Sequence, residues 1–321
     1  AVSCTLFGAF ASQFMALSSQ AGVPGLQLIF LMKLTQLLCV LVILPFVRPK
    51  LTTEDAPQAL TLSATTVTDN LGTVLMFLSF VYVVPGVAFG VIQGAIPVST
   101  ACVGFLFLGE RLDAIDSGGI LCSAAGVVLV AVGMSTAADS SSHPQLTLAI
   151  GILLPLAAAF TKGPNNVLMR SLLGVRGVSV VTVVLYVQLA GTPALLAATL
   201  LLETPHWAMS ARTAGYVIGL GLCDTFSSLS VKLVLGQEKA GVTAALMTLV
   251  IPFTILLDSV FQSHVPNLLE AAGVTLVLLG TAAVGARTWW KHRQDSRRTW
   301  LLERMNFLTS QPDDVKHAAG L

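Results

Sequence analysis

Charged residues are scarce in this chain. Asp, Glu, Lys and Arg make up only 10% of its 321 residues, whereas 55% are hydrophobic. This balance excludes an ordinary soluble protein, because water cannot solvate so apolar a chain. The few charges nearly cancel, with 17 Lys plus Arg against 16 Asp plus Glu, so we expect no nucleic-acid partner. The lipid bilayer is the expected surrounding of such a sequence.

Patterns that hold a metal or carry catalysis are also missing. The five cysteines lie in apolar runs without a second ligand at metal-site spacing, which is typical of small core residues. The five histidines are scattered over predicted loops and the tail, whereas a membrane enzyme needs paired carboxylates or a histidine beside an acid. We therefore expect no metal, no cofactor and no enzymatic activity. These residues are Cys4, Cys39, Cys102, Cys122, Cys223, His143, His206, His264, His292 and His317.

Ten long apolar runs are present instead. A transmembrane helix needs roughly 17 to 25 apolar residues to cross a hydrocarbon core about 30 Å thick. Runs of about that size, bounded by Gly, Pro or charge, predict an all-α polytopic membrane protein with ten transmembrane helices. The runs are 2–17, 26–47, 62–84, 87–108, 115–133, 146–168, 178–202, 214–235, 242–261 and 268–286.

The two halves of the chain match each other at an offset of about 155 residues. Each half then holds five helices, and an odd number makes the second half enter the membrane from the opposite face. The sequence therefore predicts two inverted five-helix repeats. The matching pairs are 84–87 with 239–242, Ile96-Pro97 with Ile251-Pro252, and, after a one-residue gap, 116–120 with 270–274 and Gly126 with Gly280.

Composition divides the chain into four parts. Residues 1–134 are the first predicted repeat and 146–287 the second. The stretch 135–145 between them contains a run of serines and Pro144, which is typical of a hydrophilic linker. Residues 288–321 are a tail in which basic and apolar residues alternate, and which forms either an amphipathic helix on the inner leaflet or a solvated end.

Basic residues orient the predicted helices, because cytoplasmic loops retain Lys and Arg. With the N-terminus in the cytoplasm, thirteen basic residues lie in inner loops and the tail, whereas only Arg212 lies outside. We therefore expect both termini to be cytoplasmic. The sequence does not distinguish the plasma membrane from the endoplasmic reticulum or Golgi as the location of the protein. A homodimer is one candidate assembly.

Several polar side chains fall inside the predicted helices. Ionisable groups are expensive there, so they usually face a polar cavity and mark a substrate path. The repeat offset places Asp69 over Asp224 and Lys33 over Gln188, which favours a central site between the repeats. Lys33 is also shallow enough for its stem to snorkel to the surface, and Asp224 could instead form a structural pair. The candidates are Lys33, Asp69, Gln93, Lys162, Asn165, Asn166, Tyr186, Gln188 and Asp224.

Lys162 lies deeper than Lys33 in its predicted transmembrane helix. It lies sixteen residues into its run and is followed by Gly163 and Pro164, which should break or kink the helix. Lys232, by contrast, is expected near the inner end of its helix. The glycines Gly119, Gly126 and Gly133 are spaced seven apart, so they are expected to form one smooth packing face on the fifth helix.

Short motifs at the helix ends resemble a known family. Pro97-Val98, Gly109-Glu110-Arg111, Asp116 and the Gly-rich fifth helix are similar to the EamA-type repeat of the drug/metabolite transporter superfamily. The second half resembles the G subgroup of the solute carrier thirty-five family, and the likeness extends to about Lys291. The residues that carry this second likeness are Glu238 and Lys239 within 237–241, Val265-Pro266, Gly273 and 284–287.

The resemblance implies a ten-helix fold that exposes a central cavity to each side in turn. It also implies a structural role for Gly109, Glu110 and Arg111 at the inner end of the fourth helix. Residues 262–264 replace that motif in the second half. The sequence lacks the Phe-Tyr-Asn-Asn and Gly-Ala-Leu-Asn-Lys motifs of nucleotide-sugar carriers, which argues against such a substrate.

Together these features predict a secondary active carrier of a small polar metabolite, with an anion favoured by the lysines inside the membrane. A proton is the candidate coupling ion, carried by Asp69 or Asp224. Three alternatives remain: a membrane adaptor that does not transport and recruits partners through its basic tail, a nucleotide-sugar carrier, and a membrane enzyme.

Overall fold

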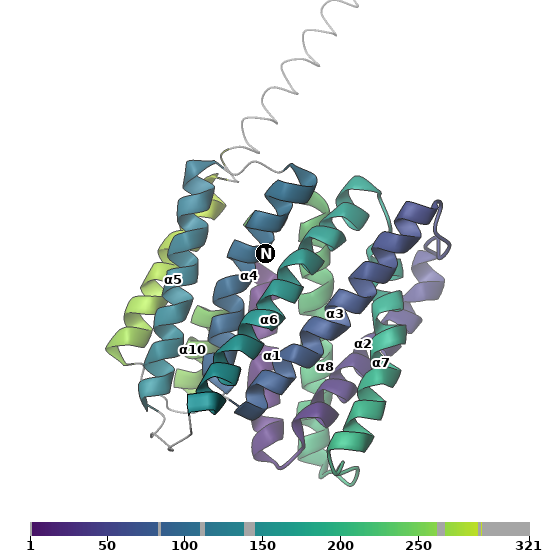
Figure 1. Cartoon of the computed structure of the whole chain (residues 1–321). Helices are drawn as coiled ribbons and strands as arrows, with labels where there is room; N and C mark the ends of the chain where they lie inside the picture. The colour runs from purple at the N-terminus through teal and green to yellow at the C-terminus, as the bar shows by residue number, and fades with distance from the viewer. Residues whose placement is uncertain are drawn as a thin grey trace, which may run out of the picture.

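The computed structural model of the chain describes residues 2–82, 85–109, 113–137, 145–261, 267–287 and 290. Its regular elements in these ranges are all helices, so the all-α prediction is confirmed there (Figure 1). The labelled helices are α1 (Val2–Gln20), α2 (Gly25–Val47), α3 (Ala56–Tyr82), α4 (Pro85–Leu108), α5 (Ala114–Ala137), α6 (Gln145–Arg170), the π-helix η1 (Ser171–Val175), α7 (Val180–Leu202), α8 (Ala211–Gln237), α9 (Ala240–Met247) and α10 (Val250–Phe261). A final helix covers Leu268–Arg287.

Seven helical stretches are long and apolar enough to cross a membrane. They make the chain a multi-pass membrane protein by length and composition, as the sequence predicts. The described part of α5 adds a shorter apolar helix, Ala114–Val130. The seven are Val2–Gln20, Gly25–Val47, Val91–Leu108, Val180–Leu202, Ala211–Gln237, Ala240–Leu257 and Leu268–Arg287.

The distribution of buried and exposed side chains suits a lipid environment. Large apolar side chains such as Phe46 and Leu201 lie on the outside, with exposed fractions of 83% and 82%. Polar side chains such as Gln27, Thr65 and Gln188 are instead buried between the helices. A soluble protein would keep its polar groups outside, because water solvates them there. The polar interior therefore belongs to a bundle whose outer surface is apolar.

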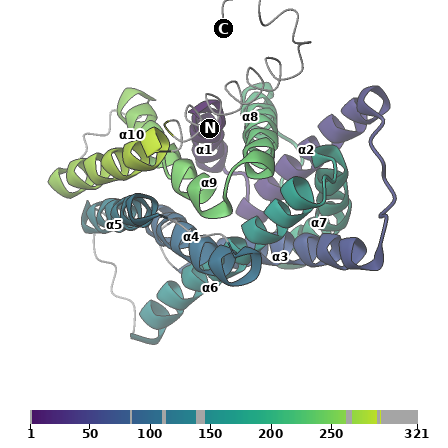
Figure 2. The same cartoon turned by 90° about the horizontal axis from the view of Figure 1, so that it is seen from above.

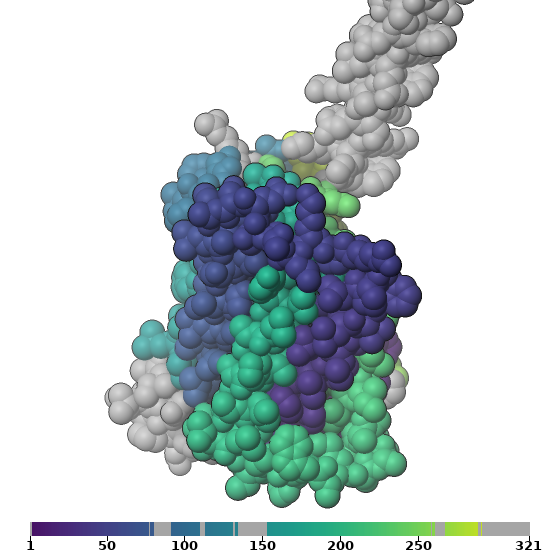
Figure 3. Space-filling model, turned by 90° about the vertical axis from the view of Figure 1, so that its right-hand side faces the viewer, coloured from purple at the N-terminus to yellow at the C-terminus, as the bar shows by residue number. Residues whose placement is uncertain are grey.

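The helices are packed so that segments far apart in sequence lie side by side. Helix α3 packs along α6, α1 along α8, and α2 along both α7 and α8. From above, α5 and α10 lie on one side of the bundle, and α2, α3 and α7 lie on the other (Figure 2). Figure 3 shows α7 at the surface between α2 and α3, both of which it contacts.

The glycines predicted to form a packing face on the fifth helix lie where α5 meets the final helix. A Cβ atom added to Gly126 would lie 2.6 Å from the carbonyl oxygen of Gly273, and one added to Gly119 would lie 2.8 Å from that of Gly280. Gly133 approaches Glu270 and Asn267 in the same way. Only residues without a side chain allow two helices to approach so closely.

Two predicted helices differ in detail. The predicted run 242–261 is two helices, α9 and α10, with a tighter turn at Thr248. Pro252 has no N–H to donate to the carbonyl of Thr248, which instead accepts from Ile251 N at 3.0 Å. Of the predicted break or kink at Gly163-Pro164, the break is wrong, because α6 continues through both residues to Arg170 and then becomes η1.

Candidate functional site

Asp69 is the centre of a buried charge cluster. Its Oδ2 atom lies 3.1 Å from Lys33 Nζ, and its Oδ1 atom lies 3.2 Å from Lys162 Nζ. Asn165 Nδ2 donates to the same Oδ1 atom at 3.1 Å. The Lys33 and Asp69 side chains are only 7% and 14% exposed. Three helices, α2, α3 and α6, therefore bring together four of the residues predicted from the sequence.

Local spacing on α3 and α6 prepares this cluster. Lys162 Nζ also donates to Thr73 Oγ1 at 2.9 Å, and Thr73 lies one turn after Asp69 on α3. Gly72 leaves room for the lysine stem, since a Cβ atom there would lie 3.0 Å from Lys162 Cε. Asn165 lies three residues after Lys162 and so shares its face of α6. The Lys162 side chain is therefore positioned by packing of its stem against Gly72 as well as by the hydrogen bonds of its ammonium group.

A chain of amides continues from this cluster toward Asp224. Gln188 on α7 donates through Nε2 to Gln36 Oε1 on α2, and Gln36 Nε2 donates to Asp224 Oδ2 on α8. Lys33 and Gln36 are three residues apart on α2, so one face of that helix joins both groups. The Oε1 atom of Gln188 is buried and has no hydrogen-bond partner among the described residues.

The buried Lys232 is a member of the site that the sequence interpretation did not include among its candidates. It lies near the end of α8, as the sequence predicts, and it is also buried there, with 7% exposure and its Nζ atom donating to Ser228 Oγ on the same helix. Asp224, Ser228 and Lys232 are spaced four apart and so follow one face of α8. The sequence shows this spacing, but it does not show that Lys232, the last of the three, is buried.

Other predicted residues lie outside the network. Asn166 donates to Thr100 Oγ1 at 3.3 Å, which ties α6 to α4. Gln93 is half-buried on α4 and is not among the hydrogen-bonded residues of the site. Tyr186 is 39% exposed and donates through its hydroxyl to the carbonyl of Leu51 at 3.1 Å, so it is not brought to the network around Asp69 and Asp224.

The predicted motif residues lie at helix ends where the structure describes them. Gly109 follows α4 with a φ of 63°, a conformation that favours glycine. Glu238 is the C-cap of α8 and Lys239 is the N-cap of α9. Glu110 and Arg111 lie outside the described residues.

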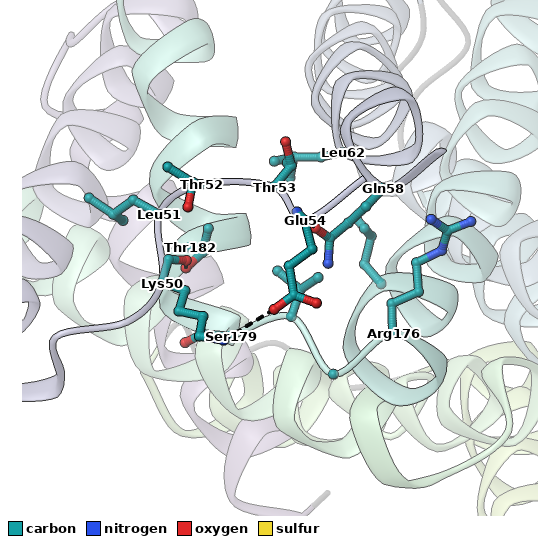
Figure 4. Close-up of a pocket in the computed structure, with 13 residues that line it drawn as sticks. Lys50, Leu51, Thr52, Thr53, Glu54, Gln58, Leu62, Arg176, Ser179 and Thr182 are labelled. Carbon is teal, nitrogen blue, oxygen red and sulfur yellow. Dashed lines mark hydrogen bonds and ion pairs between the residues drawn. The ribbon is translucent and has the colours of Figure 1, made fainter. Parts of the chain in front are cut away.

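A pocket of about 150 Å³ opens at one end of the bundle (Figure 4). It is lined by the α2–α3 connection, the start of α3, η1 and the start of α7. Charged side chains surround it, with Lys50 paired to Glu54 at 3.2 Å and Arg176 to Asp55 at 3.5 Å. Leu62 also lines it, and Asp69 lies seven residues further along α3, about 10 Å of helix.

The site is built from charged and amide side chains that lie between helices. Among the described residues no group of three metal-ligating side chains occurs. The buried groups are ammonium, carboxylate and amide, which bind ions and polar molecules through direct contacts. Lys33 and Lys162 are not available in this arrangement as the sequence interpretation assumed, because both are occupied by Asp69.

Comparison with known proteins supports the fold. No model of a known protein family matches the chain. A crystal structure of another protein shares its fold with a TM-score of 0.73 and 18% sequence identity, over 88% of this chain and 94% of that one. At this identity the likeness concerns the fold alone, and it extends over nearly the full length of both chains.

Proposed function

We propose that the protein is a secondary active carrier that moves a small polar metabolite across a membrane by alternating access. The observation that carries the proposal is the buried network around Asp69 and Asp224, which joins side chains of α2, α3, α6, α7 and α8. Charges cost so much inside an apolar bundle that they usually mark a substrate or ion path. The sequence resemblance to drug/metabolite transporters supports the same proposal.

Ten transmembrane helices are part of this proposal. The seven apolar stretches already include α9 together with the start of α10 as one crossing. The other three crossings would be α3, α5 and α6. Helices α3 and α6 are more polar because they carry Asp69, Lys162 and their partners, and these side chains lie between helices rather than toward lipid. Both termini would then be cytoplasmic, as the basic loops indicate.

The inverted repeats are supported by crossed contacts, in which each glycine of one half meets the glycine that corresponds to its neighbour's partner rather than its own. The sequence aligns Gly119 with Gly273 and Gly126 with Gly280, and in the structure Gly119 meets Gly280 while Gly126 meets Gly273. Helix packing follows the same rule, since α3 packs along α6 and the corresponding α8 packs along α1. A pseudo-twofold axis produces such crossed pairs. In carriers of this kind the substrate lies near that axis, between the repeats.

The test is an uptake screen in liposomes containing the purified full-length chain, run with and without a pH gradient. We expect accumulation of at least one small polar solute, and loss of that uptake in the double variant Lys33→Ala/Lys162→Ala. Arg212→Gln is the control, because Arg212 is an exposed residue near the opposite end of α8 from Lys232. Uptake that is absent for every solute, or unchanged in the double variant, would overturn the proposal.

A further inference from the structure

The charges of the buried site do not balance. Lys33, Lys162 and Lys232 contribute three positive charges, whereas Asp69 and Asp224 contribute two negative ones. Lys232 and Asp224 share one face of α8, and Gln36 joins Asp224 to the face of α2 that carries Lys33, so the five charges form one group. One positive charge in this group has no counter-ion among the described residues.

The unmatched charge is located at Lys232. Asp69 is shared by Lys33 and Lys162, and Asp224 accepts from Gln36. The Lys232 ammonium donates to the Ser228 hydroxyl, and it makes no ion pair in the described part of the chain. Burying an ammonium without a carboxylate is unfavourable, so a bound anion that supplies the negative charge would stabilise it.

We infer that the anionic group of the transported solute binds at Lys232, with Ser228 as a second donor, and that the substrates are small organic anions. This inference rests on the proposed carrier function and names its substrate class. The anion would complete the charge balance of the group and leave the Lys33–Asp69–Lys162 cluster intact. Lys33 and Lys162, which the sequence suggested as anion ligands, would then serve to hold Asp69 in place.

The position of Lys232 on α8 fits such a role. It lies three residues before Leu235, whose carbonyl accepts from Arg170 at 3.2 Å where the ends of α6 and α8 meet. Asp224 lies eight residues before Lys232, about 12 Å of helix. An anion that enters from the end containing Arg170 would therefore meet Lys232 before it met the carboxylate of Asp224.

Two variants separate a substrate ligand from a structural lysine. Lys232→Met removes the charge but keeps most of the stem, and Lys232→Arg keeps the charge. If Lys232 is held for an anion, Lys232→Met should be at least as thermally stable as the wild type without ligand, because a buried unpaired charge has been removed. If Lys232 is instead a structural residue, Lys232→Met should lower the thermal stability of the protein. Arg212→Gln is the matched control on the same helix.

Binding is then measured by thermal shift on the purified full chain with a panel of small carboxylates and phosphate esters, each beside its uncharged amide or alcohol. We expect an anion, but not its uncharged counterpart, to stabilise the wild type, Lys232→Arg and Arg212→Gln. Lys232→Met should bind it about tenfold more weakly or not at all. No stabilisation by any anion, or an equal response of Lys232→Met, would overturn the inference.

The outcomes distinguish the inference from the function on which it rests. Liposome uptake of an uncharged or cationic solute that is equal in wild type and Lys232→Met would overturn the anion site and leave the carrier function standing. Anion binding that depends on Lys232 without uptake of any solute would overturn the carrier function and leave the anion site standing.

Discussion

Lys33 and Lys162 bind opposite oxygens of one carboxylate, that of Asp69, at 3.1 and 3.2 Å. The two lysines come from α2 and α6, which the sequence assigns to different halves of the chain. A single acidic side chain on α3 therefore ties the halves together inside an apolar bundle. Any movement that separates α2 from α6 has to break at least one of these ion pairs or carry Asp69 with it.

The first prediction concerns this shared carboxylate. Asp69→Asn leaves two buried ammonium groups without their counter-ion, so we expect the free energy of unfolding to fall by about 3 to 5 kcal/mol. Uptake should be lost as well. Thermal unfolding in detergent and uptake in liposomes measure the two effects.

The control is Asp55→Asn, which breaks the more exposed ion pair with Arg176 at 3.5 Å. Exposed pairs are worth about 0 to 1 kcal/mol, so the change in stability should be small. Equal stability losses in the two variants would contradict a special role for the buried cluster.

The second prediction concerns the glycine contact between α5 and the final helix. Gly126→Ala places a methyl group 2.6 Å from the Gly273 carbonyl oxygen and 2.7 Å from Val277 N, so the helices have to separate. We expect a loss of about 1 to 3 kcal/mol in stability, the usual cost of overpacking. Gly118→Ala is the matched control, because nothing lies within 4 Å of the Cβ atom that it adds. If both variants melted together, the close approach of these helices would be wrong.

The third prediction concerns the amide chain from Gln188 through Gln36 to Asp224. Gln36→Leu removes both the acceptor for Gln188 and the donor to Asp224, whereas Gln188→Leu removes only one contact. We expect a loss of about 1 to 3 kcal/mol for Gln36→Leu and a smaller one for Gln188→Leu. In the double variant the two losses should not add, because the residues share one bond. Additive losses would show that the two amides act independently.

The fourth prediction concerns the membrane topology. Glu54 and Thr204 are exposed and follow α2 and α7, so an odd number of crossings should separate them in the ten-helix arrangement. In a variant without the five native cysteines, Glu54→Cys and Thr204→Cys should react with an impermeant maleimide from opposite sides of sealed vesicles. We expect Glu54→Cys to react from the cytoplasmic side. Labelling of both from one side would rule out this topology.

Much of the buried network consists of residues that the sequence singles out, whereas their pairing could not be predicted from it. Lys33, Asp69, Lys162, Asn165, Gln188 and Asp224 all lie in the buried network, because an ionisable or amide side chain in an apolar run has to find polar partners between helices. Tyr186 lies outside this network, and its hydroxyl donates to the Leu51 carbonyl. The position of Tyr186 in the apolar run 178–202 does not predict a contact with Leu51.

The amino-acid sequence by itself determined that the chain is helical and built for a membrane. Long apolar runs leave the backbone no water to bond with, so each run has to satisfy its own N–H and C=O groups as a helix. The tertiary structure decided which charges are paired. Lys33, Lys162 and Lys232 look alike in the sequence, but only packing brings Asp69 between the first two and leaves the third with a hydroxyl. Ion pairing depends on distances of a few ångströms between helices far apart in the chain, and the order of residues does not specify those distances.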